Sequence, residues 1–105
     1  MSRLLLALLA LPALAVAAPP EVSLMIKDHR FQPEEVRVPA GQKVKLVIQN
    51  QDATPEEFES HELNREKVIP GGATANVFIG PLPAGKYPFF GEFNDKTARG
   101  VVIAE

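Results

Sequence analysis

Apolar side chains recur at every second position in two stretches of the chain, residues 21–28 and 43–50. This period is typical of a strand that has one face in a core. Shorter apolar segments follow, and proline and glycine fall between them. These segments cover residues 34–38, 56–63, 65–69, 73–80, 86–93 and 99–105. The pattern predicts an all-β fold, a sandwich or barrel of seven to eight short strands.

One segment fits a second interpretation. Residues 62–68 contain good helix formers, so a short helix is an alternative to a strand or an irregular segment there.

The first 17 residues have a different pattern. Arg3 is followed by an apolar run from Leu4 to Val16 and then by small residues. We interpret residues 1–17 as a signal peptide removed before Ala18, because the run is shorter than the roughly 20 residues of a membrane span. Residues 18–105 then form a single exported domain, and a retained membrane anchor is the alternative.

Composition narrows the chemistry of this domain. The chain contains no cysteine, which excludes disulfides, thiolate catalysis, zinc-thiolate sites and iron-sulfur clusters. The ligands that are left are harder: carboxylates, two histidines, methionine and backbone oxygens. With 13 acidic and 11 basic residues, the charge gives no reason to expect nucleic acid as a partner.

The order of short motifs resembles the cupredoxin family. The pattern F-x-P-x-x-V-x-V-P-A-G runs from Phe31 to Gly41, and N-x-D follows at Asn50. P-L-x-x-G-x-Y-x-F-F ends at Phe90, and Gly100 precedes a final "VVI" segment. Together these motifs cover nearly all of residues 18–105. The resemblance implies a cupredoxin-like Greek-key β-sandwich.

The ligand positions of a blue copper cupredoxin are all changed in this chain. By resemblance, the first histidine falls on Glu56, the cysteine on Gly91 and the second histidine on Asn94, while the methionine falls near Thr97 or Ala98. A type 1 blue copper centre is not expected, because it depends on a short bond to a thiolate.

Residues 54–72, "TPEEFESHELNREKVIPGG", together with "FFGEF" at 89–93, are similar to the EfeO type of cupredoxin-like protein and its stand-alone relatives. Those proteins are periplasmic components of bacterial iron uptake systems. The resemblance implies a periplasmic protein that binds iron or copper, assists ferrous iron oxidation and delivers iron to an iron permease complex or a periplasmic iron-binding partner. Independent catalysis is not expected, and no oligomeric state is predicted.

Strand order suggests where a metal ion would bind. If consecutive strands alternate in direction, the connections at residues 28–34, 49–57 and 91–99 lie at one end of the sandwich. We therefore predict a cluster of mostly carboxylate ligands there, which suits iron, manganese, calcium or cupric ion. The predicted metal ligands are Glu56, Glu57, Glu92, Asp95, His29, Glu59 and His61, with Asp28 and Asp52 nearby.

Two alternatives stand beside this prediction. Glu57, Glu59 and His61 share one strand face and could be a solvated surface, while Phe58 and Ser60 point into the core. The second alternative, suggested by the changed cysteine, histidine and methionine positions, is a metal-free binding module that docks on a partner protein through its end loops, with Phe90 or Phe93 in contact. No hydrolytic or cofactor-binding motif is present in the sequence.

Overall fold

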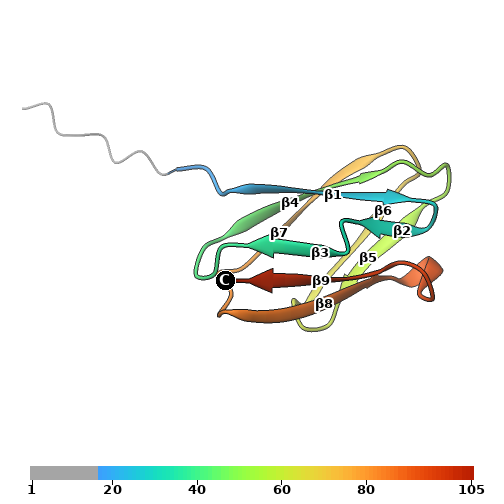
Figure 1. Ribbon diagram of the computed structural model, residues 1–105. Helices are drawn as coiled ribbons and strands as arrows, with labels where there is room; N and C mark the ends of the chain where they lie inside the picture. Colours follow the sequence, from blue (N-terminus) through green and yellow to red (C-terminus); the bar gives the residue numbers. More distant parts are fainter. Residues whose placement is uncertain (1–16) are drawn as a thin grey trace, which may run out of the picture.

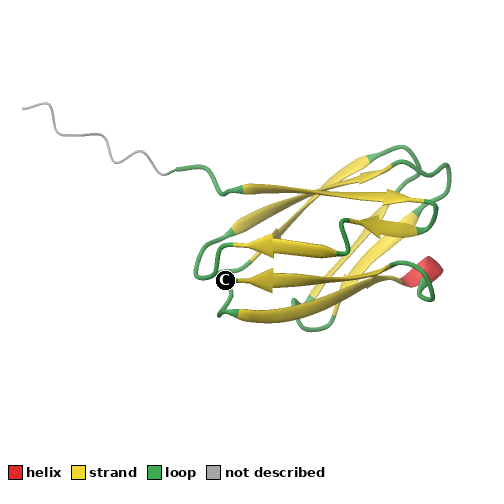
Figure 2. Ribbon diagram, in the orientation of Figure 1, coloured by secondary structure: helices red, strands yellow, loops and turns green. Residues whose placement is uncertain are grey.

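The computed structural model describes residues 17–105, which form two β-sheets packed face to face (Figures 1 and 2). Its elements are β1 (Glu21–Lys27), β2 (Arg30–Gln32), β3 (Glu35–Val38), β4 (Val44–Asn50), β5 (Glu56–Ser60), β6 (Arg65–Ile69), β7 (Thr74–Ile79), β8 (Gly85–Gly91), the 3-10 helix η1 (Glu92–Asn94) and β9 (Arg99–Ala104). The predicted all-β sandwich is confirmed. The predicted signal peptide falls almost entirely on residues 1–16, outside the described part of the chain.

The strand order is β2-β1-β4-β7 in the first sheet and β3-β9-β8-β5-β6 in the second. Two neighbouring pairs, β1 with β4 and β3 with β9, are parallel, and the others are antiparallel. The chain crosses between the sheets after β2, so β2 and β3 lie on different sheets. Non-consecutive strands therefore lie side by side in each sheet, which a local sequence pattern does not show.

Nine strands are present in residues 17–105, one or two more than predicted. The additional strand, β2, lies in a segment that we expected to be a connection. It pairs with the end of β1 through a tight turn at Asp28 and His29, which have φ of 52° and 57°. The turn directs Phe31 into the core, where it is 1% exposed.

The helix considered at residues 62–68 does not form. A turn covers His61–Asn64, with Asn64 at φ 53°, and β6 begins at Arg65. The β6 strand pairs with β5, and this tertiary pairing overrides the intrinsic helix propensity of residues 62–68.

The core lies between the sheets and follows the alternating pattern of the strands. Val44, Leu46 and Ile48 of β4 are each at most 1% exposed. Phe31, Phe58 and Phe89 pack together in this core, with ring centroids 4.9 to 6.2 Å apart. Both sheets contribute to this aromatic group, so it holds together the end of the sandwich nearest to η1. In the described residues no helix has the length and apolar character to cross a membrane.

Candidate functional site

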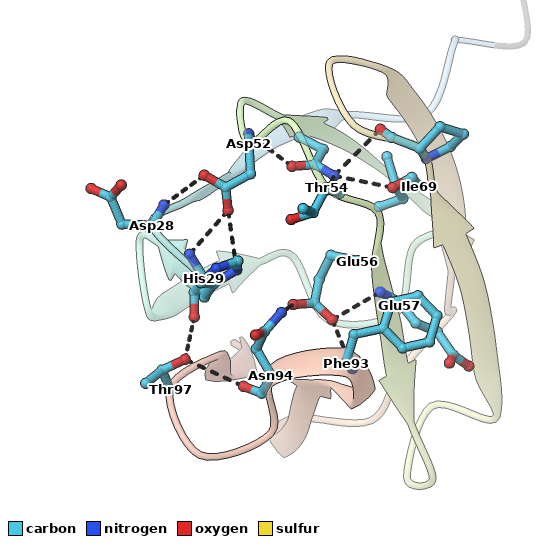
Figure 3. A network of polar contacts seen from close by, with 12 residues as sticks. Asp28, His29, Asp52, Thr54, Glu56, Glu57, Ile69, Phe93, Asn94 and Thr97 are labelled. Carbon is cyan, nitrogen blue, oxygen red and sulfur yellow. Dashed lines mark hydrogen bonds and ion pairs between the residues drawn. The ribbon is translucent and has the colours of Figure 1, made fainter.

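Three connections meet at one end of the sandwich, as the strand order predicted (Figure 3). They are the β1–β2 turn, the β4–β5 connection and the segment from η1 to β9. The Asp52 carboxylate accepts hydrogen bonds from the backbone N–H groups of Asp28 (2.8 Å) and His29 (3.0 Å). The Thr97 hydroxyl donates to the His29 carbonyl at 2.6 Å. These bonds join all three connections.

Asp52 fixes the β1–β2 turn. The backbone hydrogen bonds, led by that from His29, hold the pKa of Asp52 below its ordinary value. His29 Nδ1 also lies 3.6 Å from the Asp52 carboxylate, and the His29 side chain is 48% exposed. Asp52 therefore acts as a structural carboxylate that stabilises two residues in the left-handed region of backbone conformation.

Glu56 is buried in the middle of this end, with 1% of its surface exposed. One carboxylate oxygen, Oε1, accepts hydrogen bonds from the backbone N–H groups of Glu57 and Phe93, both at 3.0 Å. The other, Oε2, accepts from the Asn94 side-chain amide at 2.6 Å. Figure 3 shows the carboxylate between strand β5 and η1. Glu56 and Asn94, which stand at two histidine positions by resemblance, thus bind each other.

The position of the missing cysteine is also filled. A Cβ atom built on Gly91 would lie 2.7 Å from the Glu56 carboxylate carbon and 2.8 Å from the Ala98 Cβ. Ala98, close to the expected methionine position, is fully buried. The residues of this end therefore do not fit a type 1 copper centre: they have neither a thiolate nor the space for one beside Glu56.

This packing predicts the effect of Gly91→Ala. The added methyl group is expected to destabilise the fold by about 1 to 3 kcal/mol, because it overlaps a buried carboxylate that is fixed by three donors. Urea denaturation would measure this change. Gly85→Ala, at the other end of β8, is the matched control, since the atom nearest to its added Cβ would be 3.7 Å away and little change is expected. Equal stability of the two variants would contradict the prediction.

A second group of carboxylates lies on the outer face of the β5–β6 sheet. One carboxylate oxygen from each of four glutamates lies within 4.8 Å of the others. We call these residues the acidic cluster: Glu57, Glu59, Glu66 and Glu92. Glu59 and Glu66 are directly opposite each other in the β5–β6 register. Like charges at such a position destabilise a sheet, so a bound proton or cation would stabilise the cluster.

Glu57 is the buried member of the acidic cluster, at 4% exposure. Its Oε1 atom is the one buried side-chain oxygen or nitrogen in residues 17–105 that lacks a hydrogen-bond partner. A proton shared in hydrogen bonds with Glu92 and then Glu66, together with burial, raises the pKa of Glu57 to about 8. Side-chain hydrogen bonds from Glu57 and then Glu59 lower the pKa of Glu92.

Once Glu57 is ionised, its buried oxygen without a donor is costly, and a bound cation would remove that cost in place of the proton that the raised pKa retains. A cation would also relieve the repulsion between the four carboxylates. The acidic cluster therefore fits a hard metal ion, with Glu57, Glu59, Glu66 and Glu92 as the residues that could hold it.

The predicted metal ligands divide into separate groups. Glu57, Glu59 and Glu92 come together in the acidic cluster. His61 lies at the edge of this cluster, and its charge influences the pKa values of Glu59 and Glu92. His29 and Asp95 instead line a hollow beside Thr97. Metal binding by His29, Glu56, His61 and Asp95 stays a prediction.

Sequence reasoning missed Glu66. The signal was available, because folding the β5–β6 hairpin around residues 61–64 places Glu66 opposite Glu59. The predicted solvated face on β5 is correct for exposed His61 but not for Glu57, which is buried. Of the aromatic residues considered for docking, Phe93 is 50% exposed, and Phe90 is half-buried between His61 and Arg99.

Comparison with known proteins agrees with this fold. Auracyanin A, a blue copper protein from Chloroflexus aurantiacus, is 15% identical with a TM-score of 0.72, over 84% of this chain and 100% of that one. Amicyanin from Paracoccus versutus is 20% identical with a TM-score of 0.63, over 87% of each chain. The metal-binding domain of the Cu(I)-exporting P-type ATPase CopA of Streptococcus pneumoniae D39 is 11% identical with a TM-score of 0.68, over 81% of this chain and 84% of that one.

The sequence also matches a curated relative, the uncharacterized protein RP394 of Rickettsia prowazekii (strain Madrid E). The two are 48% identical over 83 residues, which is 79% of this chain. The chain spans 66% of that protein's length, just under two thirds. A model of the cupredoxin-like domain matches residues 2–104. With two packed sheets and this match over almost its whole length, the chain belongs to the cupredoxin-like domain family.

Proposed function

We propose that this chain is a periplasmic metal-binding protein that receives ferrous iron at the acidic cluster. The observation that carries the proposal is the buried Glu57 Oε1, which lacks a hydrogen-bond partner and lies among three further carboxylates. Buried carboxylate oxygens are usually hydrogen-bonded, so one without a donor is available to bind a cation. The predicted signal peptide supports export.

The chemistry of the acidic cluster favours iron oxidation. Carboxylate oxygens are hard, anionic ligands and stabilise a ferric ion more than a ferrous ion. Ferrous iron bound there would therefore lose one electron more readily, and the electron would pass to an acceptor on another molecule, such as dioxygen or a partner oxidase. The chain would assist this oxidation and then deliver iron to an iron permease complex or a periplasmic iron-binding partner. The similarity to the EfeO type supports this role.

Copper is the second ion to consider. The fold is shared with a blue copper protein and with the metal-binding domain of a copper-exporting ATPase, which supports metal binding as its general use. At the acidic cluster the available ligands are carboxylate oxygens, so cupric rather than cuprous ion fits there.

Calorimetric titration of residues 18–105 tests this function. Anaerobic Fe²⁺, and Mn²⁺ as a divalent ion that is stable in air, are expected to bind at one ion per chain. Cu²⁺ should compete for the same site. Binding no tighter than about 100 μM for any of these ions, roughly 5.5 kcal/mol of binding free energy, would contradict the proposal. Ferrous iron consumption in the presence of dioxygen, with and without the protein, then measures its effect on oxidation.

A further inference from the structure

Glu56 links β5 and η1, two of the three segments that carry the acidic cluster. Its Oε1 atom accepts from the N–H of Glu57, the buried member of the cluster, and from the N–H of Phe93, the residue after Glu92. Its Oε2 atom accepts from the Asn94 amide in the same 3-10 helix. A single buried carboxylate therefore connects the backbone of β5 to that of η1, immediately beside two of the four clustered glutamates.

Hydrogen bonds on both sides of η1 fix this helix. The helix has three residues, and Gly91, which precedes it, has no side chain with which to cap it. On its C-terminal side, Thr97 and Ala98 donate backbone hydrogen bonds to the Asn94 carbonyl. At its N-terminal side, the Phe93 N–H is bound by Glu56. Glu56 is thus a buried side chain that binds the N-terminal side of η1, next to Glu92.

Glu56 differs from the members of the acidic cluster in the direction of its side chain and in its hydrogen bonds. Along β5, successive side chains point to opposite faces of the sheet, so Glu56 points inward while Glu57 and Glu59 point outward. The Glu56 oxygens already have three donors at 2.6 to 3.0 Å. Glu57 Oε1, in contrast, has none.

We propose that Glu56 is a positioning residue, which holds Glu57 and Glu92 at the spacing required for metal binding and does not bind the metal ion itself. This inference rests on the proposed function. It assigns the residue at the family's first histidine position to the support of a neighbouring site. Partners that orient metal ligands from outside the coordination sphere commonly change metal affinity by about 10- to 100-fold.

Two substitutions at Glu56 distinguish positioning from ligation. In Glu56→Gln, the glutamine oxygen can still accept both backbone bonds, and the Asn94 amide can rotate so that its oxygen accepts from the new NH₂ group. In Glu56→Ala, all three bonds are lost. Two quantities are measured: the Mn²⁺ affinity by calorimetry, and the hydrogen exchange of the Phe93 and Glu57 amides in the metal-free protein by NMR.

The expected result is that Glu56→Ala weakens Mn²⁺ binding by about 10- to 100-fold and exposes the Phe93 amide to exchange. Glu56→Gln should keep both properties close to those of the unsubstituted protein. If Glu56→Gln binds as weakly as Glu56→Ala while the Phe93 amide stays protected, Glu56 is a ligand and the proposal is wrong. Unchanged affinity in Glu56→Ala would also overturn it.

Asn94→Ala covers the case in which Glu56→Ala fails to fold. It removes the donor to Oε2 and leaves both backbone bonds in place. A smaller loss of Mn²⁺ affinity, with faster Phe93 exchange, supports the proposal, and no change in either contradicts it. If the proposed function is wrong, the unsubstituted protein will not bind Mn²⁺. Amide exchange in the metal-free protein would still show whether Glu56 fixes η1.

Discussion

Replacing Glu57 with glutamine is expected to weaken Fe²⁺ and Mn²⁺ binding by about 100-fold or more, roughly 2.8 kcal/mol of binding free energy. Glu57 is the buried member of the acidic cluster and carries its oxygen without a partner. The substitution keeps the size of the side chain but replaces an anionic ligand with a neutral amide, which a hard cation binds less strongly. Anaerobic calorimetry with Fe²⁺, and calorimetry with Mn²⁺, measure the change.

Glu62→Gln is the matched control for this experiment. Glu62 is an exposed glutamate in the β5–β6 turn and lies outside the acidic cluster, so the same loss of charge there should leave both affinities nearly unchanged. Similar weakening by Glu62→Gln and Glu57→Gln would indicate a general effect of net charge. Unchanged Fe²⁺ and Mn²⁺ affinities in Glu57→Gln would show that the metal site lies outside the acidic cluster.

The sequence predicted the main features of the fold because burial follows the strand period. The alternating Val44, Leu46 and Ile48 are all buried, and Phe58 and Ser60 point inward as expected. The sequence did not reveal β2, because three residues are too few to show a period. The parallel pairing of β1 with β4 also joins residues far apart in sequence, which no local pattern encodes.

The candidate site was predicted only in outline. The convergence of three connections followed from strand order, and it placed Glu57 and Glu92 at the same end. The resemblance directed attention to Glu56, but a strand sends neighbouring side chains to opposite faces, so Glu56 and Glu57 have different surroundings. Glu66 was missed because its position opposite Glu59 depends on the register of the β5–β6 hairpin. That register is a property of the two strands together.

By resemblance, Glu56 and Asn94 stand at two ligand positions of a copper centre, where an ion bound by both residues would connect β5 to η1. Here the Glu56 carboxylate makes that connection through three hydrogen bonds, which include one side-chain amide and two backbone groups. The metal-binding chemistry can then lie on the neighbouring sheet face, where Glu57 carries an oxygen with no protein partner.

The metal-free protein is expected to lose stability as the pH rises from about 5 to 8. Glu57 has its pKa raised from the ordinary 4.5 of a glutamate to about 8. Between these values the folded protein retains a proton that the unfolded chain releases, so the free energy of unfolding falls as pH increases, by up to about 1.4 kcal/mol per pH unit. The raised pKa of Glu59 acts in the same direction, and the lowered pKa of Glu92 acts at more acidic pH.

Urea denaturation at several pH values, with a chelator present, measures this dependence. Glu57→Gln is expected to flatten the pH dependence and to be more stable than the unsubstituted protein at pH 8, because an amide replaces the carboxylate that has to ionise there. Saturating Mn²⁺ should restore the stability of the unsubstituted protein at pH 8 but not raise that of Glu57→Gln, since an ion that binds the folded state alone stabilises it by mass action. A flat dependence in the unsubstituted protein would show that Glu57 is ionised throughout, and that the four carboxylates coexist without the repulsion on which the metal site depends.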